Sequence, residues 1–419
     1  MNTANEVIRH VLLPVILVLL VIPVFISTVG THVLSNEPFD NESRLIFLAT
    51  FVVGQISYSL ITSSTIGVVF FPSLDGLYLL KKVGKACAQY GRSNNVFCNQ
   101  LVVLFISNFT TFVVAGLIGV LKLGRTACKI PSSVNIAVCL YTGLLFAISP
   151  GVLYKKENVL ESVTNILVTC FITTGGLILF KKWTQPLILV GYMLLVGLLI
   201  NGIRLCSGSQ TVDNLFMHDK LSMFSIKEAI FNKFVGFEFK GDILSSNIAS
   251  ALTLAFLNVL IFAITILLYS KKLKAKVDLN REFIAFGFAN MFTMICPGNL
   301  NYACSLLFVL SGKTTKYTAA LTGICSTTVF FTYHLIHSHI PIYLALFILQ
   351  FIGVSYLVDY VPLLAKLRLF DLMVTLCLTA LMHLNCGVVI AFSISLYLVI
   401  QTRILVSYGI IRKTPFISD

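Results

Sequence analysis

Apolar runs of membrane-spanning length alternate with short polar connections along almost the whole chain. A helix needs about 20 apolar residues to cross the hydrocarbon core of a bilayer, and many of the runs approach or exceed this length. Several are too long for one pass, so we predict roughly 12 to 14 membrane segments packed as a bundle of antiparallel helices. The runs occupy residues 11–29, 45–71, 101–123, 136–152, 166–180, 188–203, 248–268, 283–310, 319–336, 340–357 and 370–400.

One polar segment is much longer than the other connections and divides the apolar runs into two halves. It carries charged residues such as Asp213, Lys227 and Glu228. Because membrane transporters are often built from two related repeats, this division predicts a duplicated architecture. The predicted units are a first transmembrane repeat at 1–203, a polar connecting loop at 204–242, a second transmembrane repeat at 243–406 and a cytoplasmic tail at 407–419.

Two of the apolar runs are interrupted by residues that break a helix, at corresponding places in the two halves. The first interruption is 61–72, ITSSTIGVVFFP, and the second is 296–305, CPGNLNYACS. A helix that begins inside the membrane offers free backbone N–H groups and the positive end of its dipole, so two such starts facing each other attract an anion. The pair predicts a transport site near the bilayer midplane. The alternative is two kinks packed against neighbouring helices.

Composition supports a membrane protein and excludes a water-soluble enzyme. Of 419 residues, 57% are apolar and 11% are charged, whereas soluble domains carry about a quarter charged residues. The net charge of +13 comes from basic residues scattered among the connections, where they set orientation, so we predict contacts with membrane lipids and no nucleic-acid partner. The loop 36–43 is acidic without a base, which predicts an exterior loop and an N-terminus inside. We expect a multi-pass integral protein of the plasma membrane or a vacuole-like organelle membrane.

No motif in the sequence indicates catalysis. A nucleophile–base constellation, a complete phosphate loop and a zinc-ligand set are all missing from the sequence, so we predict no enzyme activity, no cofactor and no metal. Asp75 is the one carboxylate of interest, because it follows Pro72 by three residues. Carboxylates inside a membrane are costly and usually functional, so Asp75 is either a counter-ion or coupling group in the site, or it reaches the interface.

The stretch 277–291, VDLNREFIAFGFANM, resembles a signature of the SulP family of sulfate permeases and anion exchangers. In that family a V-D-x-N-x-E-L-x-A-x-G-x-x-N pattern leads into the ninth span. Weaker similarity lies in 119–124, GVLKLG. The likeness covers most of the chain and is closest to the shorter fungal-type members. It implies an all-α polytopic membrane protein with two inverted repeats of seven transmembrane segments, core and gate domains, and half-helices 3 and 10 beside the substrate pocket.

The resemblance also implies roles for individual residues. Asn258 is the coupling candidate, standing where proton-coupled relatives carry Glu; because an amide does not titrate, proton coupling through this position would be lost. The tripeptide 303–305, ACS, replaces the Ser-Arg-Ser of many anion transporters and removes a positive charge. The implied substrate-binding residues are Ser63, Ser64, Thr65, Gly67, Asp75, Asn301, Tyr302 and Ser305.

These observations predict a SulP-like secondary transporter of sulfate or another small anion, working by alternating access without ATP. A transporter of amino acids or other polar solutes is the alternative that Cys304 favours. A membrane-embedded enzyme and a non-transporting sensor are further alternatives. The resemblance also predicts a homodimer, whereas the family's C-terminal regulatory domain, STAS, is not expected because only a short tail follows the last apolar run.

Overall fold

The structure is a computed structural model of the chain, and it describes most of the helices that the apolar runs predict. The described residues are 15, 40–64, 70–72, 83–84, 86, 93–128, 130, 132–153, 169–176, 178–179, 186–207, 241–272, 277–296, 300–303, 316–336 and 342–383.

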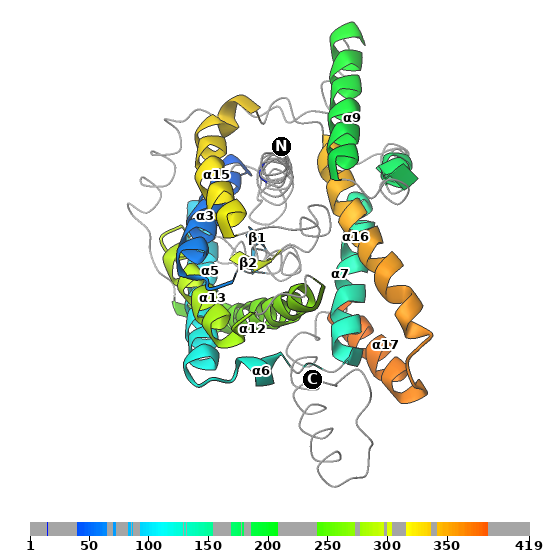
Figure 1. Ribbon diagram of the computed structural model, residues 1–419. Helices are drawn as coiled ribbons and strands as arrows, with labels where there is room; N and C mark the ends of the chain where they lie inside the picture. The colour runs from blue at the N-terminus through cyan, green and yellow to red at the C-terminus, as the bar shows by residue number, and fades with distance from the viewer. Residues whose placement is uncertain are drawn as a thin grey trace, which may run out of the picture.

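The described helices form two groups, which stand side by side in Figure 1. Helices distant in sequence pack together within each group: α3 contacts α13 and α15, and both α16 and α17 contact α7. The predicted division into a core and a gate domain is therefore confirmed. The core bundle comprises α3 (Asp40–Ile61), β1 (Phe70–Pro72), α5 (Ser93–Val120), α12 (Gly241–Lys272), α13 (Leu279–Thr293), β2 (Leu300–Ala303) and α15 (Lys316–Ile336). The gate bundle comprises α7 (Ser132–Leu153), α9 (Pro186–Ser207), α16 (Ile342–Leu364) and α17 (Leu369–His383). The short α6 (Gly124–Ala127) lies between α5 and α7.

Glycines lie where helices contact each other most closely in both bundles. A Cβ added at Gly119 of α5 would lie 2.5 Å from Ile284 Cγ1 and 2.6 Å from the carbonyl oxygen of Asn280 in α13. In the gate bundle, a Cβ at Gly353 of α16 would lie 2.5 Å from the backbone nitrogen of Ala147 in α7. These distances leave no room for a side chain, so the helix backbones approach as closely as small residues allow, as is typical of membrane bundles.

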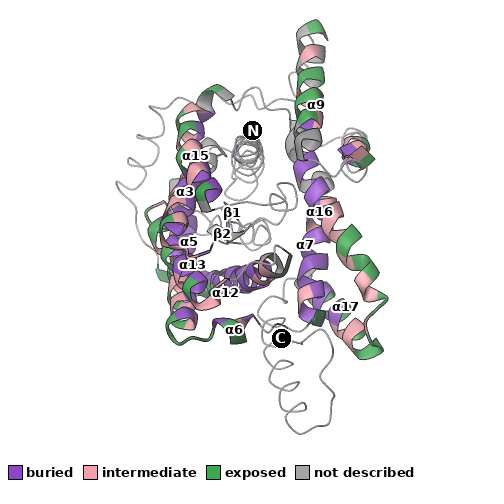
Figure 2. Cartoon of the chain, in the orientation of Figure 1, coloured by how far each residue is buried: buried purple, intermediate pink, exposed green. Residues whose placement is uncertain are grey.

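The outer surface of the bundles is apolar. Exposed residues run along α9 and α16 in Figure 2. On α5, Phe105, Phe109, Val113 and Leu117 repeat every four residues and are all exposed, which gives one lipid-facing stripe. The stretches Asn99–Val120 and Asn247–Leu267 are long and apolar enough to cross a membrane. The total number of membrane segments stays a prediction.

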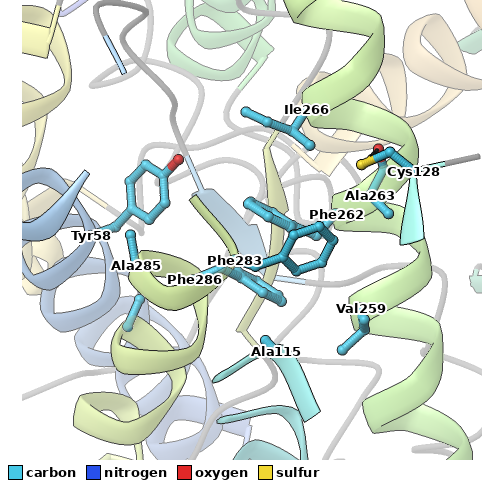
Figure 3. Close-up of a cluster of buried hydrophobic side chains, with 11 residues drawn as sticks. Tyr58, Ala115, Cys128, Val259, Phe262, Ala263, Ile266, Phe283, Ala285 and Phe286 are labelled. Carbon is cyan, nitrogen blue, oxygen red and sulfur yellow. Dashed lines mark hydrogen bonds between the residues drawn. The ribbon is translucent and has the colours of Figure 1, made fainter. Parts of the chain in front are cut away.

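Two of the apolar clusters among the described residues each join three or more helices. The larger one joins α3, α5, α12 and α13, and its centre is a stack of Phe262 on Phe286 with Phe283 edge-on to Phe262 (Figure 3). The smaller one joins the bundles, because Leu257 and Ile261 of α12 pack with Ala137 of α7, and Leu378 of α17 completes it. The long helix α12 therefore contributes to both.

The predicted exterior loop 36–43 is wrong in part, because α3 begins at Asp40 and takes up residues 40–43. The physical reason is that Asp and Glu are favourable in the first turn of a helix, where they face the positive end of its dipole. At the long connection, α9 continues to Ser207 and α12 starts at Gly241.

Candidate functional site

The two interrupted stretches meet in the core bundle as a pair of short strands. β1 pairs with β2 in antiparallel register, with Phe70 opposite Ala303, Phe71 opposite Tyr302 and Pro72 opposite Leu300. The kink alternative does not describe them, because α3 ends at Ile61 and α13 at Thr293, before each strand. Strands were not predicted from the sequence, since neither stretch shows an alternating pattern and both lie within apolar runs.

The helices that lead into the two strands are also antiparallel. Tyr58, near the end of α3, bonds to Glu282 in the first turns of α13. Thr50, earlier in α3, donates its hydroxyl to the carbonyl oxygen of Cys296 just beyond the end of α13, at 2.5 Å. Each half therefore contributes a helix, a break and a strand that run opposite to those of the other half, which is the arrangement that an inverted repeat requires.

A buried carboxylate holds the first break. Glu282 is fully buried, and its Oε1 accepts hydrogen bonds from the backbone N–H of Ser63 at 3.1 Å, the Ser63 hydroxyl at 3.1 Å and the backbone N–H of Ser64 at 2.9 Å. Its Oε2 accepts from the hydroxyls of Thr62, at 2.7 Å, and Tyr58. The carboxylate therefore accepts five hydrogen bonds at the point where α3 stops.

The other polar residues of the family-like stretch also have structural partners. Asp278 caps α13 by accepting from the backbone N–H groups of Asn280 and Arg281. Asn280 Oδ1 accepts from the backbone N–H of Gly124 at 2.9 Å, and a Cβ at Gly124 would lie 2.8 Å from the same oxygen. The two stretches that carry the SulP resemblance, 119–124 and 277–291, thus pack against each other.

The structure brings part of the predicted site together. Ser63 and Ser64 lie in the non-helical residues that follow α3, and the backbones of Asn301 and Tyr302 lie on β2. Asn258 is fully buried in α12, between Leu257 of the smaller cluster and Val259 of the larger one. Thr65, Gly67, Asp75 and Ser305 lie outside the described residues.

Glu282 is a site residue that the sequence analysis did not predict. It is the glutamate of the V-D-x-N-x-E pattern, and the resemblance implies no role for it in the site. The usable signal was its place next to a long apolar run, since an ionisable residue inside a membrane is a functional candidate by default. Among the described residues, no group of His, Cys, Asp and Glu side chains is arranged to hold a metal ion.

Comparison with solved structures identifies the fold. The transmembrane domain of a cyanobacterium bicarbonate transporter, BicA, superposes with a TM-score of 0.67 at 14% identity, covering 92% of this chain and 97% of that one. The chain has the fold of this transmembrane domain. The predicted all-α polytopic membrane fold is confirmed, and the inverted repeat agrees with these neighbours.

Two further structures show the same fold over part of a longer chain. A structure of SLC26A9 has a TM-score of 0.61 at 13% identity and covers 96% of this chain and 66% of that one. The murine Slc26a9 anion transporter in the inward-facing state has a TM-score of 0.58 at 15% identity, with 94% and 68% covered. No protein-family model and no curated protein match the sequence.

Proposed function

We propose that the chain is a SulP-type secondary transporter that moves a small anion across a membrane. The observation that carries this proposal is the pairing of β1 with β2, because it joins the two interrupted stretches inside an otherwise helical membrane bundle. A non-helical backbone at membrane depth is tolerated only where it is buried in protein or lines a cavity, and in transporters such breaks surround the substrate.

Two independent observations support the anion class and the family. The solved structures that share the fold include a bicarbonate transporter and an anion transporter. The SulP-like motifs at 119–124 and 277–291 pack together in the core bundle, as parts of one structural unit would. Sulfate as the substrate, alternating access, a homodimer and the likeness to fungal-type members are finer parts of the same proposal.

We place direct substrate contacts in the residues that follow Ser64 in the first stretch and in those of the second stretch. Ser63 and Ser64 act through Glu282, because both backbone N–H groups and the Ser63 hydroxyl already bond to its carboxylate. The contacting residues are then Thr65, Gly67, Asp75, Asn301, Tyr302 and Ser305. Asn258 is fully buried in α12, the helix that contacts β2, and it leaves transport without a titratable group at that position.

Tracer uptake into liposomes that contain the purified protein tests the proposal. Sulfate, bicarbonate, chloride and a basic amino acid are compared at equal concentration, without ATP. Saturable uptake of an anion, inhibited by excess of the same unlabelled anion, supports the proposal. Uptake of the amino acid alone would favour the second candidate, a transporter of polar solutes, which the absence of arginine from the 303–305 tripeptide supports. Binding of a solute without uptake would favour a sensor.

A further inference from the structure

The donors at the first break are occupied by an anion that belongs to the protein. Five hydrogen bonds reach the Glu282 carboxylate from residues 58, 62, 63 and 64, all of them within α3 or directly after it. Two of the five come from backbone N–H groups, which can only donate. An arrangement of this kind would hold a small external anion equally well if the glutamate were absent.

Burial makes this contact important for the geometry of the break. A buried carboxylate is costly unless hydrogen bonds replace its hydration, and here they are supplied by the last turn of α3 and the residues directly after it. No Lys, Arg or His side chain among the described residues pairs with Glu282. The break and the carboxylate therefore depend on each other: without Glu282, the N–H of Ser63 would lose its acceptor, and the N–H of Ser64 would keep only the Thr62 hydroxyl.

The position of Glu282 along α13 connects the two halves of the proposed site. Its carboxylate fixes the chain just before the residues that lead to β1, and α13 itself ends at the turn that leads to β2. Its neighbours keep it in place, since Phe283 and Phe286 are fully buried in the larger cluster and Asp278 caps the helix. A displacement of Glu282 therefore reaches residues 62–64, whereas the end of α13 keeps its own bond to Thr50.

We propose that Glu282 is a positioning residue for transport, an internal anion that holds Thr62, Ser63 and Ser64 so that the chain beyond them enters the site in one conformation. This inference rests on the proposed function. It also implies that the transported anion binds to donors other than the five that bond to the carboxylate.

Three variants of the full-length protein test the inference. Glu282→Ala removes the acceptor. Glu282→Gln keeps the shape, because its carbonyl oxygen can face the two N–H groups while its amide donates to the hydroxyls of Tyr58 and Thr62. Phe283→Ala is the matched control, because it removes an equally buried side chain from the next position of the same helix. The measurements are the KM and maximal rate of uptake, and thermal unfolding in detergent with and without sodium formate, chosen as a free carboxylate.

The expected results separate positioning from mere stability. Glu282→Ala should raise KM roughly tenfold or more, because small displacements of binding groups are costly, while Glu282→Gln should stay within roughly threefold of the wild type. Formate should raise the unfolding temperature of Glu282→Ala and leave that of Phe283→Ala and the wild type unchanged. An unchanged KM in folded Glu282→Ala, or the same large loss in Glu282→Gln, would overturn the inference.

The formate measurement does not depend on transport. If the wild type shows no uptake of any solute, the proposed function fails, but selective stabilisation of Glu282→Ala by formate would still establish that residues 62–64 form a carboxylate-binding cradle. If uptake is normal and formate has no selective effect, the cradle is wrong while the proposed function stands.

Discussion

The hydroxyl of Thr50 lies 2.5 Å from the carbonyl oxygen of Cys296, across 246 positions of the sequence. This bond fixes the end of α13 against the middle of α3, just before the second break. It is the counterpart of the contact between Glu282 and residues 62–64, which fixes the end of α3 before the first break. Each helix therefore carries the group that holds the end of the other. The Glu282 carboxylate on α13 holds the end of α3, and the Thr50 hydroxyl on α3 holds the end of α13.

Thr50→Val should lower stability by about 1 kcal/mol, the usual net contribution of a buried hydrogen bond. Valine keeps the branched shape, so the loss comes from the Cys296 carbonyl oxygen that is left without its donor. Thr174→Val is the control, because the Thr174 hydroxyl is exposed and donates only to the local Cys170 carbonyl. Thermal unfolding in detergent measures both. Equal changes in unfolding temperature for the two variants would show that the bond between Thr50 and Cys296 adds no stability beyond that of a local hydrogen bond.

Gly119→Ala should destabilise the core bundle by about 1–3 kcal/mol, the usual cost of inserting a group into packed space. The new methyl group would meet Ile284 and the Asn280 carbonyl oxygen at distances that require α5 and α13 to separate. Gly191→Ala is the matched control, since nothing lies within 4 Å of a Cβ there. The control should be neutral or slightly stabilising, because alanine favours a helix over glycine. A neutral Gly119→Ala would mean that the helices can move apart freely.

Lys122→Gly should raise stability by about 1 kcal/mol, because a left-handed backbone costs an ordinary residue this much. Lys122 has φ 56°, and it ends α5 with bonds from its own N–H to the Gly119 carbonyl and from the Leu123 N–H to the Ile118 carbonyl. This is a Schellman ending, where glycine is preferred. Lys366→Gly serves as a control for the loss of a positive charge. A lower unfolding temperature for Lys122→Gly would indicate that the lysine side chain outweighs the strain.

Cys128 should resist alkylation in the folded protein. It lies in the connection between α6 and α7, and burial raises the pKa of its thiol from 9.0 to about 12. The thiolate is the reactive form, so labelling at pH 8 should be slow until the protein unfolds.

Because the folded pKa of Cys128 lies above the unfolded one, this group's contribution to stability is complete below pH 9 and is lost as the pH rises towards 12. Mass spectrometry after maleimide treatment, native against denatured, checks the labelling; equal rates would contradict it.

Ser305→Trp should abolish uptake while the protein stays folded, because a bulky ring in the second interrupted stretch would fill the proposed site. Lys271→Ala is the control, because that lysine belongs to the basic segment that follows the apolar part of α12 and should affect orientation more than transport. Tracer uptake and size-exclusion chromatography together separate lost function from lost folding. Normal uptake by Ser305→Trp would remove Ser305 from the site.

The amino-acid sequence by itself determined the membrane class, the helical architecture and the places where two helices break. These depend on hydropathy and on local residues such as Pro72, whose backbone effects act within a few positions of the chain. The family-like stretch 277–291 was also recognisable, although no local pattern indicates a physical role for its glutamate. The substrate-contacting roles of Thr65, Gly67, Asp75 and Ser305 stay predictions.

Only the tertiary structure decided what the breaks do. It paired β1 with β2, grouped helices from both halves into a core and a gate bundle, and placed Glu282 against Ser63 from 219 positions away. No local pattern encodes such a contact, because the packing of the helices decides which donors surround a carboxylate. The hydropathy of the chain between residues 63 and 282 does not specify which residues come together. The sequence therefore shows where a helix ends, and the fold shows which distant side chain stabilises the non-helical backbone at that end.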